Sequence, residues 1–190
     1  MNGLLRAAAE VQEFCLGHGW RFCFIGGLAV QRWGEPRVTR DVDLTIMTGF
    51  GGEATFVDLL LEHFPARVDD AREFALRSRV LLARSAEGVP VDIALGALPF
   101  EGRVVSRATP YAYAPGIDLL TCSAEDLVVL KAFAGRERDW LDIEGIVVRQ
   151  GDRLSTQLVW HELQPLLELK EAPEHAERLR ALVDEARRSG

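Results

Sequence analysis

Residues 41–47 alternate polar and apolar side chains, beginning with Asp41, Val42 and Asp43. An alternation of period two is typical of a β-strand that is buried on one face only. Side chains two positions apart leave the same face of a strand, so the two carboxylates are expected roughly 7 Å apart on that face. Val42 and Leu44 point the other way, into a core. The chain must therefore build a sheet that carries acidic groups on its polar face.

The rest of the chain divides into a mixed N-terminal part and a helical C-terminal part. Short runs rich in aromatic and β-branched residues predict further strands at 21–25, 73–76, 79–84 and 89–95, the last two as a hairpin. Apolar residues at helical spacing predict helices at 3–18, at 28–33 and around 56–64. Beyond the segment 111–120, a helix-start signature at Ser123 and Asp126 opens a run of helices expected at 123–134, 137–149, 155–170 and 173–188.

We therefore expect an α/β (α+β) fold in which a mixed β-sheet is flanked by helices. A core domain is predicted over residues 1–115. A helical C-terminal domain is predicted over residues 116–190, where it would close a cleft. The linker between the two is expected near Pro110 to Gly116, because proline and glycine punctuate that stretch.

Composition and charge exclude several classes of protein. The chain has 190 residues, 48% of them hydrophobic, which suits one or two globular domains. The net charge of -7 disfavours generic binding to nucleic acid. Apolar runs fall short of the ~18 residues that span a bilayer, so we expect a cytoplasmic protein with no membrane association. The three cysteines lack disulfide or zinc-site spacing and are expected in the core.

A third aspartate repeats the pattern of the first strand, since Asp92 lies between Val91 and Ile93. If its strand lies beside residues 41–47, at the ~4.8 Å spacing of paired strands, three carboxylates converge on one spot. Such charges repel unless cations neutralise them, and two Mg²⁺ (or Mn²⁺) ions about 4 Å apart would do so. We therefore predict Asp41, Asp43 and Asp92 as metal ligands and catalytic groups. The alternative is a solvated strand face.

Gly26 and Gly27 end the strand predicted at 21–25 and lead into the next helix. Free backbone amides and the helix dipole favour a phosphate there, although a Gly-Gly pair is also compatible with a plain turn. The connector before the aspartate pair carries Arg37, Thr39 and Arg40. These side chains can reach a phosphate, or pair with the aspartates when no metal is bound.

Lys131 falls on the apolar stripe of its predicted helix, four residues after Leu127. An inward lysine needs an anionic partner, which a phosphate would supply; the alternative is a lysine that snorkels at the edge of the stripe. Arg136 follows the end of this helix and can hold phosphate or be solvated. Asp139 and Asp142, one helical turn apart, are expected to order the arginines near them.

Three motifs occur in order along the chain: Phe24-Ile25-Gly26-Gly27, Asp41-Val42-Asp43-Leu44 and Val91-Asp92-Ile93. This array resembles the signature of the polymerase-beta-like nucleotidyltransferase superfamily. Residues 37–43 and the downstream Glu125-Asp126-Leu127, Lys131 and Arg136 to Asp139 look like those of the abortive-infection (Abi) type nucleotidyltransferase toxins and related uncharacterised families. The resemblance covers about residues 20–150. The chain departs from many members at Gly27, where a serine is common.

The resemblance implies an enzyme that moves a nucleoside monophosphate from an NTP, such as ATP, to an acceptor hydroxyl in RNA or protein, with Mg²⁺ or Mn²⁺. The Abi-type similarity implies a toxin with an antitoxin protein as partner. Asp92 would act as the base, and the nucleotide would be bound by Gly26, Gly27, Arg37, Thr39, Arg40, Lys131 and Arg136. Two alternatives stay open. One is transfer to a small molecule such as an aminoglycoside, and the other is a non-catalytic nucleotide- or partner-binding module with the same fold.

Overall fold

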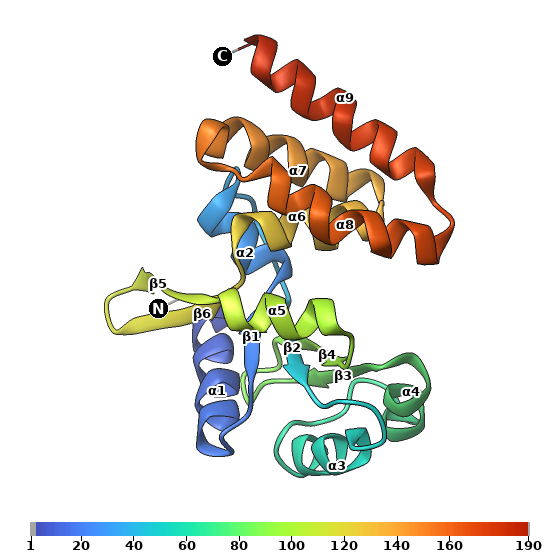
Figure 1. Cartoon of the computed structure of the whole chain (residues 1–190). Helices are drawn as coiled ribbons and strands as arrows, with labels where there is room; N and C mark the ends of the chain where they lie inside the picture. Colours follow the sequence, from blue (N-terminus) through green and yellow to red (C-terminus); the bar gives the residue numbers. More distant parts are fainter. Residues whose placement is uncertain (1–2, 190) are drawn as a thin grey trace. The chain divides into compact units, whose positions relative to one another are not determined.

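The computed structural model of the protein describes residues 3–189 (Figure 1). The elements in chain order are α1 (Gly3–Gly17), β1 (Phe22–Phe24), α2 (Gly26–Trp33), β2 (Val42–Met47), α3 (Glu53–His63), α4 (Ala71–Ser78), β3 (Val80–Arg84), β4 (Pro90–Gly96), α5 (Pro99–Arg107), β5 (Thr109–Ala114), β6 (Ile117–Thr121), α6 (Ala124–Ala134), α7 (Glu137–Gln150), the 3₁₀ turn η1 (Gly151–Arg153), α8 (Thr156–Lys170) and α9 (Pro173–Ser189).

The described chain contains a mixed six-stranded sheet with strand order β3-β4-β2-β1-β6-β5. β2 runs parallel to β4 and antiparallel to β1, which in turn runs parallel to β6. The hairpins β3–β4 and β5–β6 form the two ends of the sheet. The predicted α/β (α+β) fold with a mixed sheet flanked by helices is confirmed, as is the hairpin expected at 79–95.

One face of the sheet packs against α1, α3 and α4 and forms the main hydrophobic core. The stripe predicted on the first helix is buried there, with Ala8, Val11 and Cys15 fully inaccessible. Strand residues Val42, Leu44 and Ile46 enter the same core. Because strand side chains alternate, residues 41, 43, 45 and 47 face the other side, on which α5 contacts β1 and β2.

Two local predictions are wrong. Residues 73–76 are not a strand but the middle of α4, whose Ala71 and Ala75 are buried at helical spacing. Pro110 to Gly116 is not a linker but most of the β5–β6 hairpin. Pro110 is tolerated because β5 is an edge strand, where a missing amide need not break the ladder. Helix α5, which follows β4 directly, was not predicted at all.

Contacts divide the chain into two compact units. The sheet unit contains residues up to 28 and 38–122, and the helical unit contains 29–37 and the residues from 123 onward. The division therefore follows Cys122 rather than residue 115, and a segment from the N-terminal half belongs to the helical unit. The helices expected after residue 122 are all present, as α6 to α9. Within residues 3–189, no helix combines the length and apolarity needed to cross a membrane.

Ser123 begins the helical unit and gives a test of its local structure. Its hydroxyl accepts a hydrogen bond from the Asp126 amide at 3.1 Å and donates one to Asp126 Oδ2 at 2.8 Å, and Asp126 is fully buried. We expect Ser123→Ala to lower the free energy of unfolding by about 1–2 kcal/mol. Ser155 caps α8 through one 3.3 Å bond from Leu158 N in an exposed turn, so Ser155→Ala is expected to cost less. Urea unfolding of both variants measures the difference, and equal losses would contradict it.

Candidate active site

The predicted convergence of the three aspartates depends on the pairing of β2 with β4. The two strands are parallel neighbours, and Asp43 lies directly opposite Asp92 in their register. Paired residues point to the same face of a sheet, so both carboxylates leave the face opposite the main core. Asp41 lies immediately before β2, two residues from Asp43. All three aspartates are partly exposed, so the sheet presents them to solvent.

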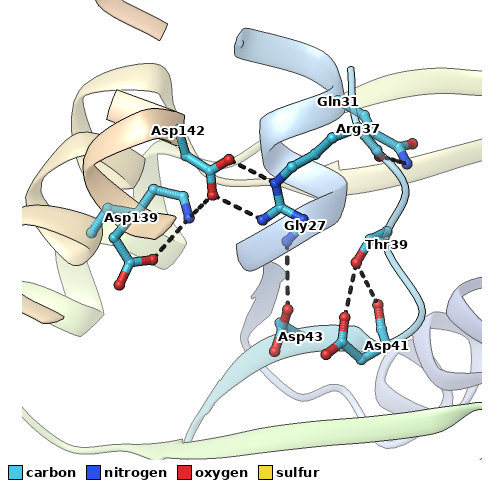
Figure 2. Close-up of polar contacts among 9 residues, drawn as sticks. Gly27, Gln31, Arg37, Thr39, Asp41, Asp43, Asp139 and Asp142 are labelled. Carbon is cyan, nitrogen blue, oxygen red and sulfur yellow. Dashed lines mark hydrogen bonds and ion pairs between the residues drawn. The ribbon is translucent and has the colours of Figure 1, made fainter. Parts of the chain in front are cut away.

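The glycine turn between β1 and α2 packs directly on this acidic group. Gly26 has a φ of +54°, and a Cβ atom added to it would lie 2.0 Å from Asp43 Oδ2. The Gly27 amide, at the first turn of α2, donates to Asp43 Oδ2 at 3.4 Å (Figure 2). The positive end of the helix thus faces a carboxylate. Strand, glycine turn and helix follow one another as predicted, and here the free amide is directed at Asp43.

Thr39 fills the space beside the second glycine. A Cβ atom on Gly27 would lie 2.2 Å from Thr39 Oγ1 and 2.6 Å from Thr39 Cβ, so no larger residue fits at position 27 while Thr39 keeps its place. The Thr39 hydroxyl donates to Asp41 Oδ1 at 2.8 Å (Figure 2). Thr39 therefore fixes the orientation of the first aspartate and lies where a side chain of residue 27 would otherwise be.

The environment of Asp92 shifts the pKa of its carboxyl group. Partial burial raises the pKa of Asp92 above its ordinary value, and the negative charge of Asp41 adds to the rise. The guanidinium of Arg67 opposes it, because Arg67 Nη2 donates to Asp92 Oδ1 at 2.6 Å. A carboxylate of raised pKa is suited to accept a proton.

The three carboxylates are ligands of the chemical type that binds a divalent cation, since Mg²⁺ and Mn²⁺ prefer hard oxygen ligands. Asp43 and Asp92 are in register on adjacent strands, and a cationic guanidinium already lies on Asp92. Within residues 3–189, however, no three His, Cys, Asp or Glu side chains are grouped so that they could hold one metal ion together. Asp41 and Asp92 are each turned to a partner of their own, Thr39 and Arg67.

The helical unit holds two of the predicted phosphate-binding groups, Lys131 and Arg37, in a charge cluster of its own. Lys131 Nζ lies 2.6 Å from Asp142 Oδ2 and 3.2 Å from Asp139 Oδ1, and its side chain is only 8% exposed. Arg37 forms two hydrogen bonds to Asp142, at 2.6 and 2.8 Å (Figure 2). Lys131 is inward-facing as predicted, and its anionic partners belong to the chain itself. Its contact with a nucleotide stays a prediction.

The two aspartates of α7 have different roles from the one expected. Asp139 accepts from the backbone amide of Arg136 at 3.3 Å, which caps the helix, and otherwise binds Lys131. Asp142 binds Arg37 and Lys131 rather than the arginines near it in the sequence. Arg136 is exposed, as is Arg40 in the sheet unit, and their predicted contacts with phosphate are untested.

Arg67 is a site residue that sequence reasoning missed. It lies between α3 and α4, far along the chain from Asp92, and no motif surrounds it. Residue 67 is brought beside β3 by the long-range pairing of Ala66 with Ala83, which is a feature of the fold and not of the local sequence. The pairing of Lys131 with Asp142 had a local signal, because the two residues lie on consecutive helices.

Replacing Gly26 tests how close the turn lies to Asp43. We expect Gly26→Ala to lower the free energy of unfolding by more than the about 1–2 kcal/mol that left-handed backbone costs an alanine, because the new methyl group also collides with Asp43. Gly88→Ala is the matched control, since Gly88 has a φ of +78° and nothing within 4 Å of its added Cβ. Chemical denaturation compares the two, and a smaller loss at position 26 would contradict the close approach.

The Asp142 cluster predicts a pH dependence of stability. Burial would raise the pKa of Asp142, but hydrogen bonds from Arg37 and Lys131 outweigh it and hold the pKa below its ordinary value. A carboxylate of depressed pKa stabilises the fold fully above its unfolded pKa of about 3.9 and loses that contribution as the pH falls through the folded value. We expect the stability of the wild-type protein to fall below about pH 4, with a shallower fall in Asp142→Asn.

The control for this pH dependence is Asp118→Asn, a strand aspartate exposed to solvent. The Asp118→Asn variant should show the same dependence of stability on pH as the wild-type protein. At pH 7, Asp142→Asn should also lower the free energy of unfolding by about 3 kcal/mol, because Arg37 and Lys131 both lose the buried negative charge with which they are paired. Urea unfolding between pH 2.5 and 7, in about half-unit steps, measures both effects. An unchanged slope in Asp142→Asn would contradict the assignment.

No protein-family model matches the chain, and no curated protein matches it. Solved structures do. An antigenic nucleotidyltransferase-like protein from Paracoccidioides brasiliensis superposes with a TM-score of 0.53 at 17% identity, over 94% of this chain and 92% of that one. The antibiotic-resistance factor ANT(2'')-Ia superposes with a TM-score of 0.54 at 16% identity, over 91% of this chain and 96% of that one.

These identities are low, so the likeness concerns the fold. The Abi-type similarity stays a prediction, because neither of these two structures is described as an Abi-type toxin. The superfamily resemblance that the three motifs predicted is confirmed at the level of the fold: the chain has the nucleotidyltransferase fold.

Proposed function

We propose that this protein transfers a nucleoside monophosphate from an NTP to an acceptor hydroxyl. The observation that carries the proposal is the register that sets Asp43 opposite Asp92, next to the glycine turn that opens α2. A carboxylate group beside the positive end of a helix offers a place for metal ions and for the phosphates they accompany. The nucleotidyltransferase fold supports this reaction class.

In the proposed site Asp41, Asp43 and Asp92 would hold Mg²⁺ or Mn²⁺. When bound, the metal would neutralise the triphosphate and lower the pKa of the acceptor hydroxyl. Thr39 keeps Asp41 oriented, and the backbone amide of Gly27 does the same for Asp43. Two of the three carboxylates are thus restrained before any ligand arrives, whereas Asp92 is held by Arg67 and has to exchange that partner for the metal.

Asp92 is the proposed base. Its raised pKa makes it a better proton acceptor than an ordinary aspartate, and its side chain is 33% exposed, so an acceptor can reach it. The acceptor oxygen forms a bond to the α-phosphorus, the bond from that phosphorus to the bridging oxygen breaks, and pyrophosphate leaves with the bonding electrons. The hydroxyl proton passes to Asp92.

The preferred acceptor in this proposal is RNA or protein, and a toxin role with an antitoxin partner in the cytoplasm remains part of it. A second candidate is a small cationic molecule. The net charge of -7 favours a cationic acceptor over a polyanion. One structural neighbour, ANT(2'')-Ia, is an antibiotic-resistance factor. Transfer of label to an aminoglycoside, or resistance on expression, would select this candidate.

The reaction is tested with α-labelled NTPs and Mg²⁺, offering total RNA, total protein and aminoglycosides in parallel. We expect label to appear on one class of acceptor. Asp43→Asn should reduce the rate at least about 100-fold, since it removes a charge from the proposed metal site. The rate is measured by product separation at several substrate concentrations.

Asp118→Asn is the matched control, because it makes the same chemical change on an exposed strand position outside the site. It should retain wild-type activity. No transfer to any acceptor, combined with nucleotide binding in calorimetry, would favour the non-catalytic binding module instead. Equal activity in Asp43→Asn and the wild-type protein would contradict the proposed site.

A further inference from the structure

The contact between Arg67 and Asp92 is held in place by backbone pairing. Arg84 N donates to Pro65 O at 2.9 Å, and Arg67 N donates to Leu82 O at 3.0 Å. Residues 65–67 therefore run alongside the outer edge of β3. Leu82 in turn lies opposite Asp92 in the β3–β4 pairing. The backbone of residue 67 is thus fixed two strand spacings from Asp92, about 9–10 Å away.

That separation is spanned by the long side chain of Arg67, which crosses β3 to reach the carboxylate. Arg67 Nη2 lies 2.6 Å from Asp92 Oδ1, a short charge-assisted hydrogen bond. The side chains are 21% and 33% exposed respectively, so the pair is partly shielded from solvent but not sealed from it. The backbone of residue 67 is held by its pairing with β3, and the guanidinium is partly exposed beside Asp92.

We propose that Arg67 is an internal counter-ion that competes with the divalent metal for Asp92. This inference rests on the proposed function and assigns a new role at the same site. Without metal, Arg67 holds Asp92 and offsets its repulsion by Asp41. A divalent cation close to the three aspartates would be repelled by the guanidinium, so Arg67 leaves Asp92 when the metal binds. Arg67 thereby sets the metal affinity and positions Asp92 in the metal-free protein.

This role accounts for the way in which the aspartates of the site are arranged. Within the described residues 3–189, no three acidic or other metal-ligating side chains are grouped around one point, although Asp43 and Asp92 are in register. The Arg67 contact directs Asp92 toward the β3 edge of the sheet. Release of that contact would free Asp92 to turn toward the other two carboxylates.

The competing explanation is that Arg67 only ties residues 65–67 to the sheet. The two roles differ in what a neutral substitution does. Loss of a structural tie lowers the stability and leaves the metal affinity as it was. Loss of a competing cation increases the metal affinity, because the negative charge of the carboxylates is then uncompensated. Arg67→Lys separates charge from shape, since lysine keeps the charge but cannot reproduce the guanidinium geometry.

The test measures Mn²⁺ binding to the full chain in the absence of nucleotide, by the electron paramagnetic resonance of free Mn²⁺ and by the shift in melting temperature. We expect Arg67→Gln to bind Mn²⁺ roughly tenfold more tightly than the wild-type protein, from the repulsion between a single and a double positive charge in solvent. Arg67→Lys should bind within about threefold of the wild-type protein, because lysine retains the charge.

Arg84→Gln is the matched control, because Arg84 lies on the same β3 strand and donates to Gly88 O at 3.2 Å. It changes the net charge equally and should leave Mn²⁺ affinity near the wild-type value. Equal or weaker Mn²⁺ binding by Arg67→Gln would overturn the proposal while leaving the proposed function intact. If neither Arg67→Gln nor the wild-type protein binds Mn²⁺, the proposal and the metal site of the proposed function are both overturned.

Discussion

The parallel pairing of β2 with β4 is the constraint on which the candidate site depends. This pairing sets Asp43 opposite Asp92, and the apolar neighbours of both aspartates hold the two strands in that register. Val42, Leu44 and Val91 are fully buried on the core face. A slip of one residue in either strand would turn its apolar side chains outward and its aspartate into the core, where burial of an unpaired charge is costly. The hydrophobic core thus determines where the acidic face lies.

Close packing around the aspartates adds a second constraint. The turn at Gly26 approaches Asp43 within the space that any side chain would need, and Thr39 occupies the space beside Gly27. Such contacts limit the freedom of Asp41 and Asp43, because each carboxylate is hydrogen-bonded to a nearby group of the chain. Gly27 and Thr39 therefore act as a pair: the small residue in the helix makes room for the hydroxyl that orients Asp41.

The features that sequence reasoning identified have their signals within a few residues. The alternation around Asp43, the turn at Gly26 and the Ser123 cap are each encoded locally, and all three are found in the structure. The segment 73–76 was misassigned because four residues cannot distinguish a strand from one turn of helix. The Arg67–Asp92 pair was out of reach, since it depends on an isolated bridge between residues distant in sequence.

Lys131 shows why local chemistry leaves a binding role undecided. A lysine that is 8% exposed requires an anion, and the sequence correctly indicated that need, but phosphate and carboxylate satisfy it equally well. Here Asp142 supplies the charge, and in the sheet unit Arg67 supplies the cation that Asp92 requires. Lys131 and Asp92, both assigned to ligands by their chemistry, are therefore already paired within their own units. Any phosphate or metal that uses them must exchange one ion pair for another, so its affinity is a difference between two similar interactions and is set as much by the internal partner as by the ligand.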